Sequence, residues 1–187
     1  MAVSMAPPDT TTMITGEALL AMGDIGPVEL VDGRIVHMSP TGGVHGRVEL
    51  RLARRLDEFV EQRRLGFVLV GETGIYTRRN PDRVRGMDIA FVSNTRAQAM
   101  PTGFLTVAPE LIVEIVSPSD TWVEIQEKID EYFALGVDFI WIVDPKNRQV
   151  LVHRGSNEVV RLSGGDMLRG EGILDGFALP LPLLFAE

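Results

Sequence analysis

The chain has 187 residues, 45% of them hydrophobic and 24% charged, which predicts one globular domain large enough to bury a core. It has no cysteine, so disulfide scaffolds, cysteine-based zinc sites and thiol nucleophiles are excluded. The net charge of −8 argues against loose, nonspecific adhesion to nucleic acid.

The first residues of the chain and its hydropathy predict how many domains it has and whether it crosses a membrane. Residues 1–12 are predicted to form a disordered tail, followed by a single domain over residues 13–187. No stretch approaches the run of about 18 apolar residues that a membrane span requires, and the first residues lack a basic region followed by an apolar one. We therefore expect a soluble, cytoplasmic protein with no membrane segment.

The first half of the chain predicts a hairpin between two helices. A short helix is expected at 15–22. Strands at 28–31 and 34–38 flank Asp32-Gly33, a dipeptide whose positive φ angles suit a two-residue hairpin turn. At 44–64 apolar residues recur with the helical period while arginine and glutamate fill the other faces, which predicts an amphipathic helix packed on a sheet.

The second half predicts several strands around one more helix. Ser117-Pro118-Ser119-Asp120 is typical of a helix start with a Ser or Asp cap, and Gly136 is expected to end that helix. Residues 179–183 are too rich in proline for a helix interior and are expected to pack as an irregular apolar segment. Strands are expected at 67–70, 74–77, 87–92, 111–116, 139–143, 149–154 and 158–162.

Core positions follow from the same periodicities. The buried stripe of the second long helix is expected to comprise Trp122, Ile125, Ile129, Tyr132 and Phe133. Trp122 and Trp141 are both expected in the core rather than as platforms for stacking bases.

Two carboxylates interrupt otherwise apolar strands. Glu114 lies in the middle of a six-residue apolar run, where a buried carboxylate costs several kcal/mol unless it is paired or bound to a metal. Asp88 opens another apolar strand, although aspartate is unfavourable in strands. Two interpretations remain open: both acids are satisfied by arginine partners, or they meet and hold a hard cation such as Mg²⁺.

Phosphodiester cleavage at such a site needs a base or a positive charge near the attacking water. Lys128 is the candidate, because it lies on the helix after the Glu114 strand at the edge of the buried stripe. The alternative is a surface lysine whose stem covers apolar side chains while its ammonium group stays in water.

His45 and Glu49 are four residues apart on the first long helix, a spacing that places two ligands on one helical face. Arginines surround them, so a local ion pair is the favoured interpretation. Residues 34–85 hold eleven arginines against six acidic residues, and this basic segment is either a solvated surface or a surface that faces phosphate.

The order and spacing of these residues resemble the PD-(D/E)xK nuclease superfamily, and in particular its Uma-two family of restriction-endonuclease-like proteins. The resemblance spans about residues 13–185. It is carried by Asp88, by Glu114-Ile115-Val116 on a following strand, and by Ser117-Pro118-Ser119-Asp120 before the helix that holds Lys128. Further matching pieces are Glu29 to Gly33, Met38-Ser39-Pro40 through His45-Gly46, Gly71-Glu72-Thr73-Gly74 and Val143-Asp144-Pro145.

The resemblance implies an α/β (α+β) fold with a restriction-endonuclease-like mixed β-sheet flanked by helices, and an active site where two strands diverge. It implies metal ligation by Asp88 and Glu114, with Mg²⁺, or alternatively Mn²⁺, as the cation. Glu72 is an additional acidic candidate for the site. The alternative is that Glu72 is only a polar residue at a strand end beside a glycine turn. Val116 stands where the superfamily has its lysine, so Lys128 resembles a migrated catalytic lysine. Met87 replaces the usual proline, which supplies no ligand.

As an endonuclease the protein is expected to hydrolyse phosphodiester bonds in DNA and to form a homodimer, since cutting both strands requires two sites. The alternatives are a nuclease fold that binds nucleic acid or protein without cutting, and a regulatory homodimer in which Glu114 and Lys128 form a buried ion pair. The arginines expected to contact phosphates are Arg47, Arg51, Arg55, Arg78, Arg79 and Arg85.

Overall fold

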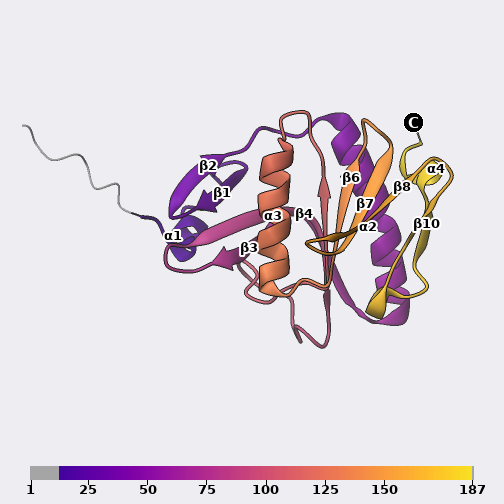
Figure 1. Ribbon diagram of the computed structural model, residues 1–187. Coiled ribbons are helices and arrows are strands. Elements are labelled where there is room, and N and C mark those ends of the chain that lie inside the picture. Colours follow the sequence, from indigo (N-terminus) through magenta and orange to yellow (C-terminus); the bar gives the residue numbers. More distant parts are fainter. Residues whose placement is uncertain (1–12, 187) are drawn as a thin grey trace, which may run out of the picture.

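The computed structural model describes residues 13–186, so the tail predicted over residues 1–12 lies outside the described residues. A mixed sheet forms the middle layer, with helix α2 on one face and helix α3 on the other (Figure 1). The predicted fold class, a mixed sheet flanked by helices, is confirmed. None of the helices in residues 13–186 is both long and apolar enough to cross a membrane.

The chain contributes three layers of elements in an α+β order. The helices are α1 (Gly16–Ala21), α2 (Gly43–Arg63), α3 (Trp122–Leu135), the 3₁₀ helix η1 (Gly172–Leu174) and α4 (Leu181–Leu184). The strands are β1 (Val28–Val31), β2 (Arg34–His37), β3 (Gly66–Arg78), β4 (Arg83–Ser93), β5 (Leu111–Ile115), β6 (Phe139–Asp144), β7 (Gln149–Gly155), β8 (Glu158–Ser163), β9 (Met167–Arg169) and β10 (Ala178–Pro180).

Strand β4 organises the main sheet, whose order is β2-β1-β4-β5-β6-β7-β8 with β3 also paired to β4. On one edge β4 pairs with β3 along most of its length. On the other edge it meets β1 at Val84 and β5 from Ile89 onward, so no described strand pairs with the residues between. Strands β5 and β6 are parallel, and α3 connects them. The sheet therefore opens a gap beside residues 85–88 of β4.

Each face of the sheet carries its own core. On the α2 side, Leu52, Leu56 and Val60 pack with Phe91 and Trp141 of the sheet. On the other side, Ile125, Ile129 and Tyr132 of α3 pack with central strand residues that include Ile112 and Ile140. Trp141 is buried as predicted, whereas the core position predicted for Trp122 is wrong, because Trp122 is the first residue of α3 and is 54% exposed.

Several local predictions are confirmed and others are corrected. The hairpin turn forms at Asp32-Gly33, with φ angles of 52° and 74°. Helix α3 is capped by Thr121 in a capping box with Glu124, and not by the predicted Ser or Asp, because its first turn begins one residue later. Gly136 ends that helix in the left-handed conformation, as predicted.

Two further segments differ from the prediction. The strands predicted at 67–70 and 74–77 are one strand, β3, with a bulge between Val70 and Thr73 where Gly71 and Glu72 adopt positive φ. The segment predicted to be irregular at 179–183 instead forms the end of β10 and the short helix α4. Proline is tolerated there because it occupies the cap and first turn of α4, where a helix needs no N–H donor.

His153 on β7 makes a prediction about acid stability. It is buried, both ring nitrogens lack a hydrogen-bond partner, and burial lowers its pKa below the usual 6.5. Because the unfolded chain takes up this proton first, the stability tied to neutral His153 is complete above pH 6.5 and is lost as the pH falls below it. We expect His153→Leu to lose less unfolding free energy than the wild type between pH 7.5 and 5.5 in urea titrations.

The matched control is His37→Leu, because His37 is an exposed histidine on β2. Its pH dependence should follow that of the wild type. Equal pH dependence for His153→Leu and the wild type would contradict the prediction.

Candidate active site

Asp88 lies at the gap in the sheet, where β5 turns away from the first half of β4. Its carboxylate is 5% exposed, and its Oδ2 accepts a hydrogen bond of 2.6 Å from the backbone N–H of Ile115. Ile115 is the last residue of β5, and the Asp88 carboxylate therefore replaces the backbone carbonyl oxygen that would accept this bond from a neighbouring strand. Aspartate is unfavourable in strands, but here the hydrogen bond satisfies its buried carboxylate and orients it.

Helix α2 brings His45 and Glu49 to the same carboxylate. His45 Nε2 lies 3.3 Å from Asp88 Oδ2, and His45 Nδ1 lies 3.9 Å from Glu49 Oε2. The predicted local pair is therefore present, but it also reaches Asp88 on β4. Burial opposes protonation of His45, yet the hydrogen bond and charge of Asp88 outweigh it and raise its pKa above 6.5.

Glu114 faces α3, on the other side of the gap. Its Oε1 accepts a hydrogen bond of 2.6 Å from the Tyr132 hydroxyl, and its Oε2 lies 3.5 Å from Lys128 Nζ. Burial raises the pKa of Glu114 to about 8, and the negative charge of Asp88 contributes to the rise. At neutral pH the Glu114 carboxyl group therefore tends either to keep its proton or to pair with a positive charge.

Lys128 is held by three oxygen atoms. Its ammonium group lies 3.0 Å from Glu29 Oε1, 3.4 Å from the carbonyl oxygen of Gly86 and 3.5 Å from Glu114 Oε2. Burial would lower its pKa, but the charges of Glu114 and Glu29 outweigh burial and raise it above the usual 10.5. Lys128 is therefore a fixed ammonium ion, and the exposed surface lysine considered as the alternative is wrong.

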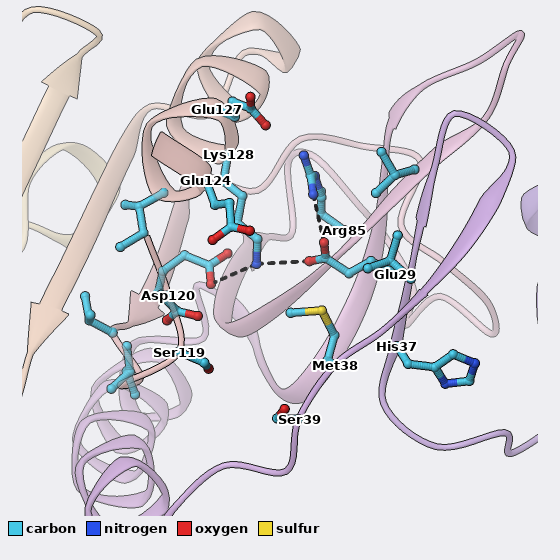
Figure 2. Close-up of a pocket in the computed structure, with 16 residues that line it drawn as sticks. Glu29, His37, Met38, Ser39, Arg85, Ser119, Asp120, Glu124, Glu127 and Lys128 are labelled. Atoms are coloured by element: carbon cyan, nitrogen blue, oxygen red, sulfur yellow. Dashed lines mark hydrogen bonds and ion pairs between the residues drawn. The ribbon is translucent and has the colours of Figure 1, made fainter. Parts of the chain in front are cut away.

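Glu29 on β1 is the residue of this cluster that the sequence interpretation did not assign a role. It is 3% exposed and joins Lys128 to Arg85, whose Nη1 donates to it at 2.8 Å. Arg85 also forms two hydrogen bonds to Glu131 of α3, at 3.0 and 2.8 Å. Figure 2 shows Glu29 lying between Lys128 and Arg85. Glu29 is the one polar residue of a four-residue hairpin strand, a position at which a solvent-facing glutamate is ordinary.

Glu72 lies at the bulge of β3 and reaches Gly86 of β4. A Cβ atom on Gly86 would lie 2.5 Å from Glu72 Oε2, so the missing side chain makes room for this carboxylate. Burial of the carboxyl group, followed by the charge of Asp88, raises the pKa of Glu72. The structure thus brings Glu72 to the cluster, although nothing assigns it a ligand role.

Gly86→Ala tests the place of Glu72. The nearest obstacle to the new methyl group is the end of a flexible side chain, so we expect a cost of about 1–3 kcal/mol in unfolding free energy and displacement of the Glu72 carboxylate. The stabilisation of the protein by Mn²⁺, measured as a shift in Tm, should shrink. Gly155→Ala is the control because nothing lies within 4 Å of its added Cβ. An unchanged metal response in Gly86→Ala would show that Glu72 is not needed there.

A cavity of about 420 Å³ adjoins Lys128 and Glu114. Its walls come from β1, β2, the end of β5 and the first turns of α3, and Figure 2 shows Lys128 and Glu29 meeting inside it while His37 points away. Apolar wall residues include Val36, Met38 and Val116, and the acidic residues Asp120, Glu124 and Glu127 also line it. The side chains of Glu29, Glu114 and Lys128 are thus accessible from this cavity, whose lining residues do not include Asp88.

The arginines of the basic segment divide into two groups. Those at the end of β3, directly after it or on β4 pair with carboxylates of the protein itself: Arg78 with Asp32, Arg79 with Glu17 and Asp82, and Arg85 with Glu29 and Glu131. Arg85 is 8% exposed, so it has little surface to offer a phosphate. On α2, Arg55 pairs with Glu58 at the surface, Arg51 binds the C-terminal segment, and Arg47 is exposed. Their contacts with nucleic acid stay predictions.

The donor set fits a divalent cation. Within residues 13–186, His45, Glu49 and Asp88 form a group whose ligand atoms all lie within 4.8 Å of one another. The Nδ1 atom of His45 is buried without a hydrogen-bond partner and faces Glu49 at 3.9 Å, so a cation between the two would satisfy it. Glu114, predicted as a ligand with Asp88, lies outside this group of three and contacts Lys128 and Tyr132.

Comparison with known proteins gives the family of the chain. Residues 17–182 match the model of the Uma2 family, which is described as "Putative restriction endonuclease". The chain belongs to the Uma2 family. The resemblance stated from the sequence is thereby confirmed. A search of the curated proteins finds no match for this Uma2 protein.

Among solved structures, the Uma2 chain is similar to a crystal structure from Anabaena variabilis described as "a putative nuclease belonging to DUF820". The TM-score is 0.78 at 19% sequence identity, and the match covers 92% of this chain and 98% of that one. At this identity the likeness establishes a shared, nuclease-like fold for the Uma2 protein.

Proposed function

We propose that this Uma2 protein is a metal-dependent endonuclease that hydrolyses phosphodiester bonds in DNA. The observation that carries the proposal is that Lys128 Nζ lies 3.5 Å from Glu114 Oε2 while Asp88 accepts a hydrogen bond from Ile115, the residue after Glu114. Two carboxylates that could hold a cation, beside a fixed ammonium ion, suit in-line attack on a phosphodiester.

The chain's own residues divide the work. Asp88 would hold the cation with His45 and Glu49, whose ligand atoms lie within 4.8 Å of one another, and Glu114 is the further carboxylate proposed to reach it from β5. Glu72 lies close enough to Asp88 for the charge of Asp88 to raise its pKa. When bound, a divalent cation supplies Lewis-acid stabilisation of the charge that develops on the phosphate. Lys128 remains an ammonium ion because Glu114 and Glu29 raise its pKa, so it orients the attacking water and stabilises negative charge and does not accept a proton.

We propose Mg²⁺ as the cation, with Mn²⁺ as the alternative that the histidine favours. Carboxylate oxygens suit both Mg²⁺ and Mn²⁺, whereas an imidazole nitrogen is a ligand mainly of transition-metal ions, to which Mn²⁺ belongs. Replacing His45 with Gln should therefore lower the affinity for Mn²⁺ more than that for Mg²⁺, as measured by calorimetric titration of each cation. Equal losses for both cations would remove His45 from the ligand set.

The proposal is tested by nicking of supercoiled plasmid and cleavage of single-stranded DNA, with Mg²⁺ and then Mn²⁺. Wild-type cleavage that disappears in Asp88→Asn and Glu114→Gln supports it. The control is Glu61→Gln, an exposed acidic residue near the end of α2 that does not line the cavity at Lys128, which should cut as well as the wild type. An inert wild type whose Tm does not respond to either cation would overturn the proposal and favour a structural Glu114 and Lys128 ion pair.

We further propose that the protein acts as a homodimer, because cutting both strands of a duplex requires two active sites. Light scattering after size-exclusion chromatography should give twice the chain mass of 20.6 kDa. A mass near that of one chain at every concentration would contradict it.

A further inference from the structure

A second cavity of about 440 Å³ lies between the first turns of α2, the turn that joins β6 to β7, and the C-terminal segment. Three arginines line it: Arg47 and Arg51 from α2 and Arg148 from the turn. None of the described residues that line it is acidic. This basic cavity therefore concentrates positive charge in a chain whose net charge is −8.

The three arginines of the basic cavity are not equivalent. Arg51 donates hydrogen bonds to the carbonyl oxygens of Leu184 and Ala186, so it fastens the C-terminal segment that forms one wall. Arg47 and Arg148 are exposed, and within residues 13–186 neither forms an ion pair or a hydrogen bond through its side chain. These two guanidinium groups are available to a ligand, unlike Arg78, Arg79 and Arg85.

The basic cavity opens on the same edge of the sheet as the cavity at Lys128. Ile115 and Val116, at the end of β5, line the cavity at Lys128, and Pro145, directly after β6, lines the basic cavity. Because β5 and β6 are parallel neighbours, their carboxyl ends share one edge, at the top of Figure 1. On α2, His45 reaches Asp88 while Arg47, two residues later, lines the basic cavity.

Charge differs on the two sides of the candidate active site. Toward α3, the exposed carboxylates of Asp120, Glu124 and Glu127 line the cavity at Lys128 and repel a phosphate chain (Figure 2). Toward α2, Arg47 and Arg148 attract one. If one phosphate of a DNA strand lies at Asp88 and Glu114, the charges therefore favour a path for the rest of that DNA strand over the start of α2.

We propose that Arg47 and Arg148 bind a backbone phosphate of the substrate strand, on the α2 side of the phosphate that is cleaved. This inference rests on the proposed nuclease function and adds the direction in which the strand lies. Guanidinium groups suit the site because their planar donors match phosphate oxygens in pairs. The contact carries no base specificity, so it positions the strand for cleavage without selecting a sequence.

The test is binding of a fluorescein-labelled single-stranded DNA, followed by anisotropy with Ca²⁺ as the cation and gel analysis to confirm that the DNA stays intact. The variant is Arg47→Gln with Arg148→Gln; glutamine is used at both positions because Arg148 has a φ of 51° and a branched replacement would add strain. The control, Arg54→Gln with Arg161→Gln, removes the same charge from exposed positions outside the basic cavity.

We expect the variant to bind about tenfold more weakly at 0.1 M salt. The slope of log K against log salt should fall by about 0.7 for each phosphate that the protein no longer neutralises. The control should keep the wild-type slope. Equal losses of affinity in variant and control, or no binding of DNA by the wild type, would overturn the inference.

The readout separates this inference from the proposed function. A wild type that binds through Arg47 and Arg148 but cuts nothing with any cation supports the phosphate site and contradicts the nuclease. A wild type that cuts, with unchanged binding and kcat/KM in the variant, contradicts the phosphate site alone. An RNA of the same sequence that binds with the same slope supports a contact through phosphate, because both backbones carry it.

Discussion

Lys128→Met is expected to lower DNA cleavage by about 10²- to 10³-fold while leaving the metal-induced rise in Tm in place. The size follows from removing one fixed positive group from a site where charge develops. The two readouts separate because Lys128 contacts Glu29, Gly86 and Glu114, whereas His45, Glu49 and Asp88 form the group that could hold an ion.

The measurement is single-turnover cleavage beside thermal unfolding with and without Mn²⁺. Lys146→Met is the matched control, because Lys146 is the other lysine of the chain and lies exposed in the turn between β6 and β7. Asp88→Asn should lose both cleavage and the metal response. If Lys128→Met cuts at the wild-type rate, or loses the metal response as Asp88→Asn does, the role assigned to Lys128 is wrong.

Arg85→Met is expected to lower the free energy of unfolding by about 3 kcal/mol or more. Arg85 is 8% exposed and binds Glu29 and Glu131, so its removal leaves one buried and one half-buried carboxylate with fewer partners. The loss should lie at the lower end of the range for buried pairs, because Arg83 and Thr77 still contact Glu131 and Lys128 still contacts Glu29.

Urea unfolding measures this loss. Arg55→Met is the control, since Arg55 and Glu58 form an exposed pair on α2 whose removal should cost less than about 1 kcal/mol. Similar costs for the two variants would show that the ion pairs around Arg85 contribute little to stability. Because these ion pairs lie at the wall of the cavity, Arg85 is expected to hold Glu29 and Glu131 in place.

Local patterns predict most of the fold. The Asp32-Gly33 turn, the helix ended by Gly136 and the strands of the second half all depend on signals within a few residues. The wrong predictions concern residues whose burial is not decided by their neighbours in the sequence. Trp122 lies at the first position of α3 and points outward, although its spacing from Ile125 matches the buried stripe.

The candidate site is predictable where a residue violates its local pattern. Glu114 and Asp88 stand out because carboxylates are costly in apolar strands, and the structure brings both to the gap beside Lys128. Glu29 violates no pattern in its short strand, and His45 with Glu49 forms a pair that needs no distant partner. Their roles depend on contacts between distant elements of the chain, which neither hydrophobic periodicity nor helix-capping residues can predict.

The cluster draws its side chains from β1, α2, β3, β4, β5 and α3, which together span residues 28–135 and both faces of the sheet. No contiguous fragment shorter than this span can carry it, so a proteolytic cut anywhere within the span that releases one element would remove a member. A cation that binds only the assembled cluster would stabilise all six elements at once by mass action. Hydrogen exchange should therefore slow together in α2 and α3, two helices on opposite faces of the sheet, when the metal is added.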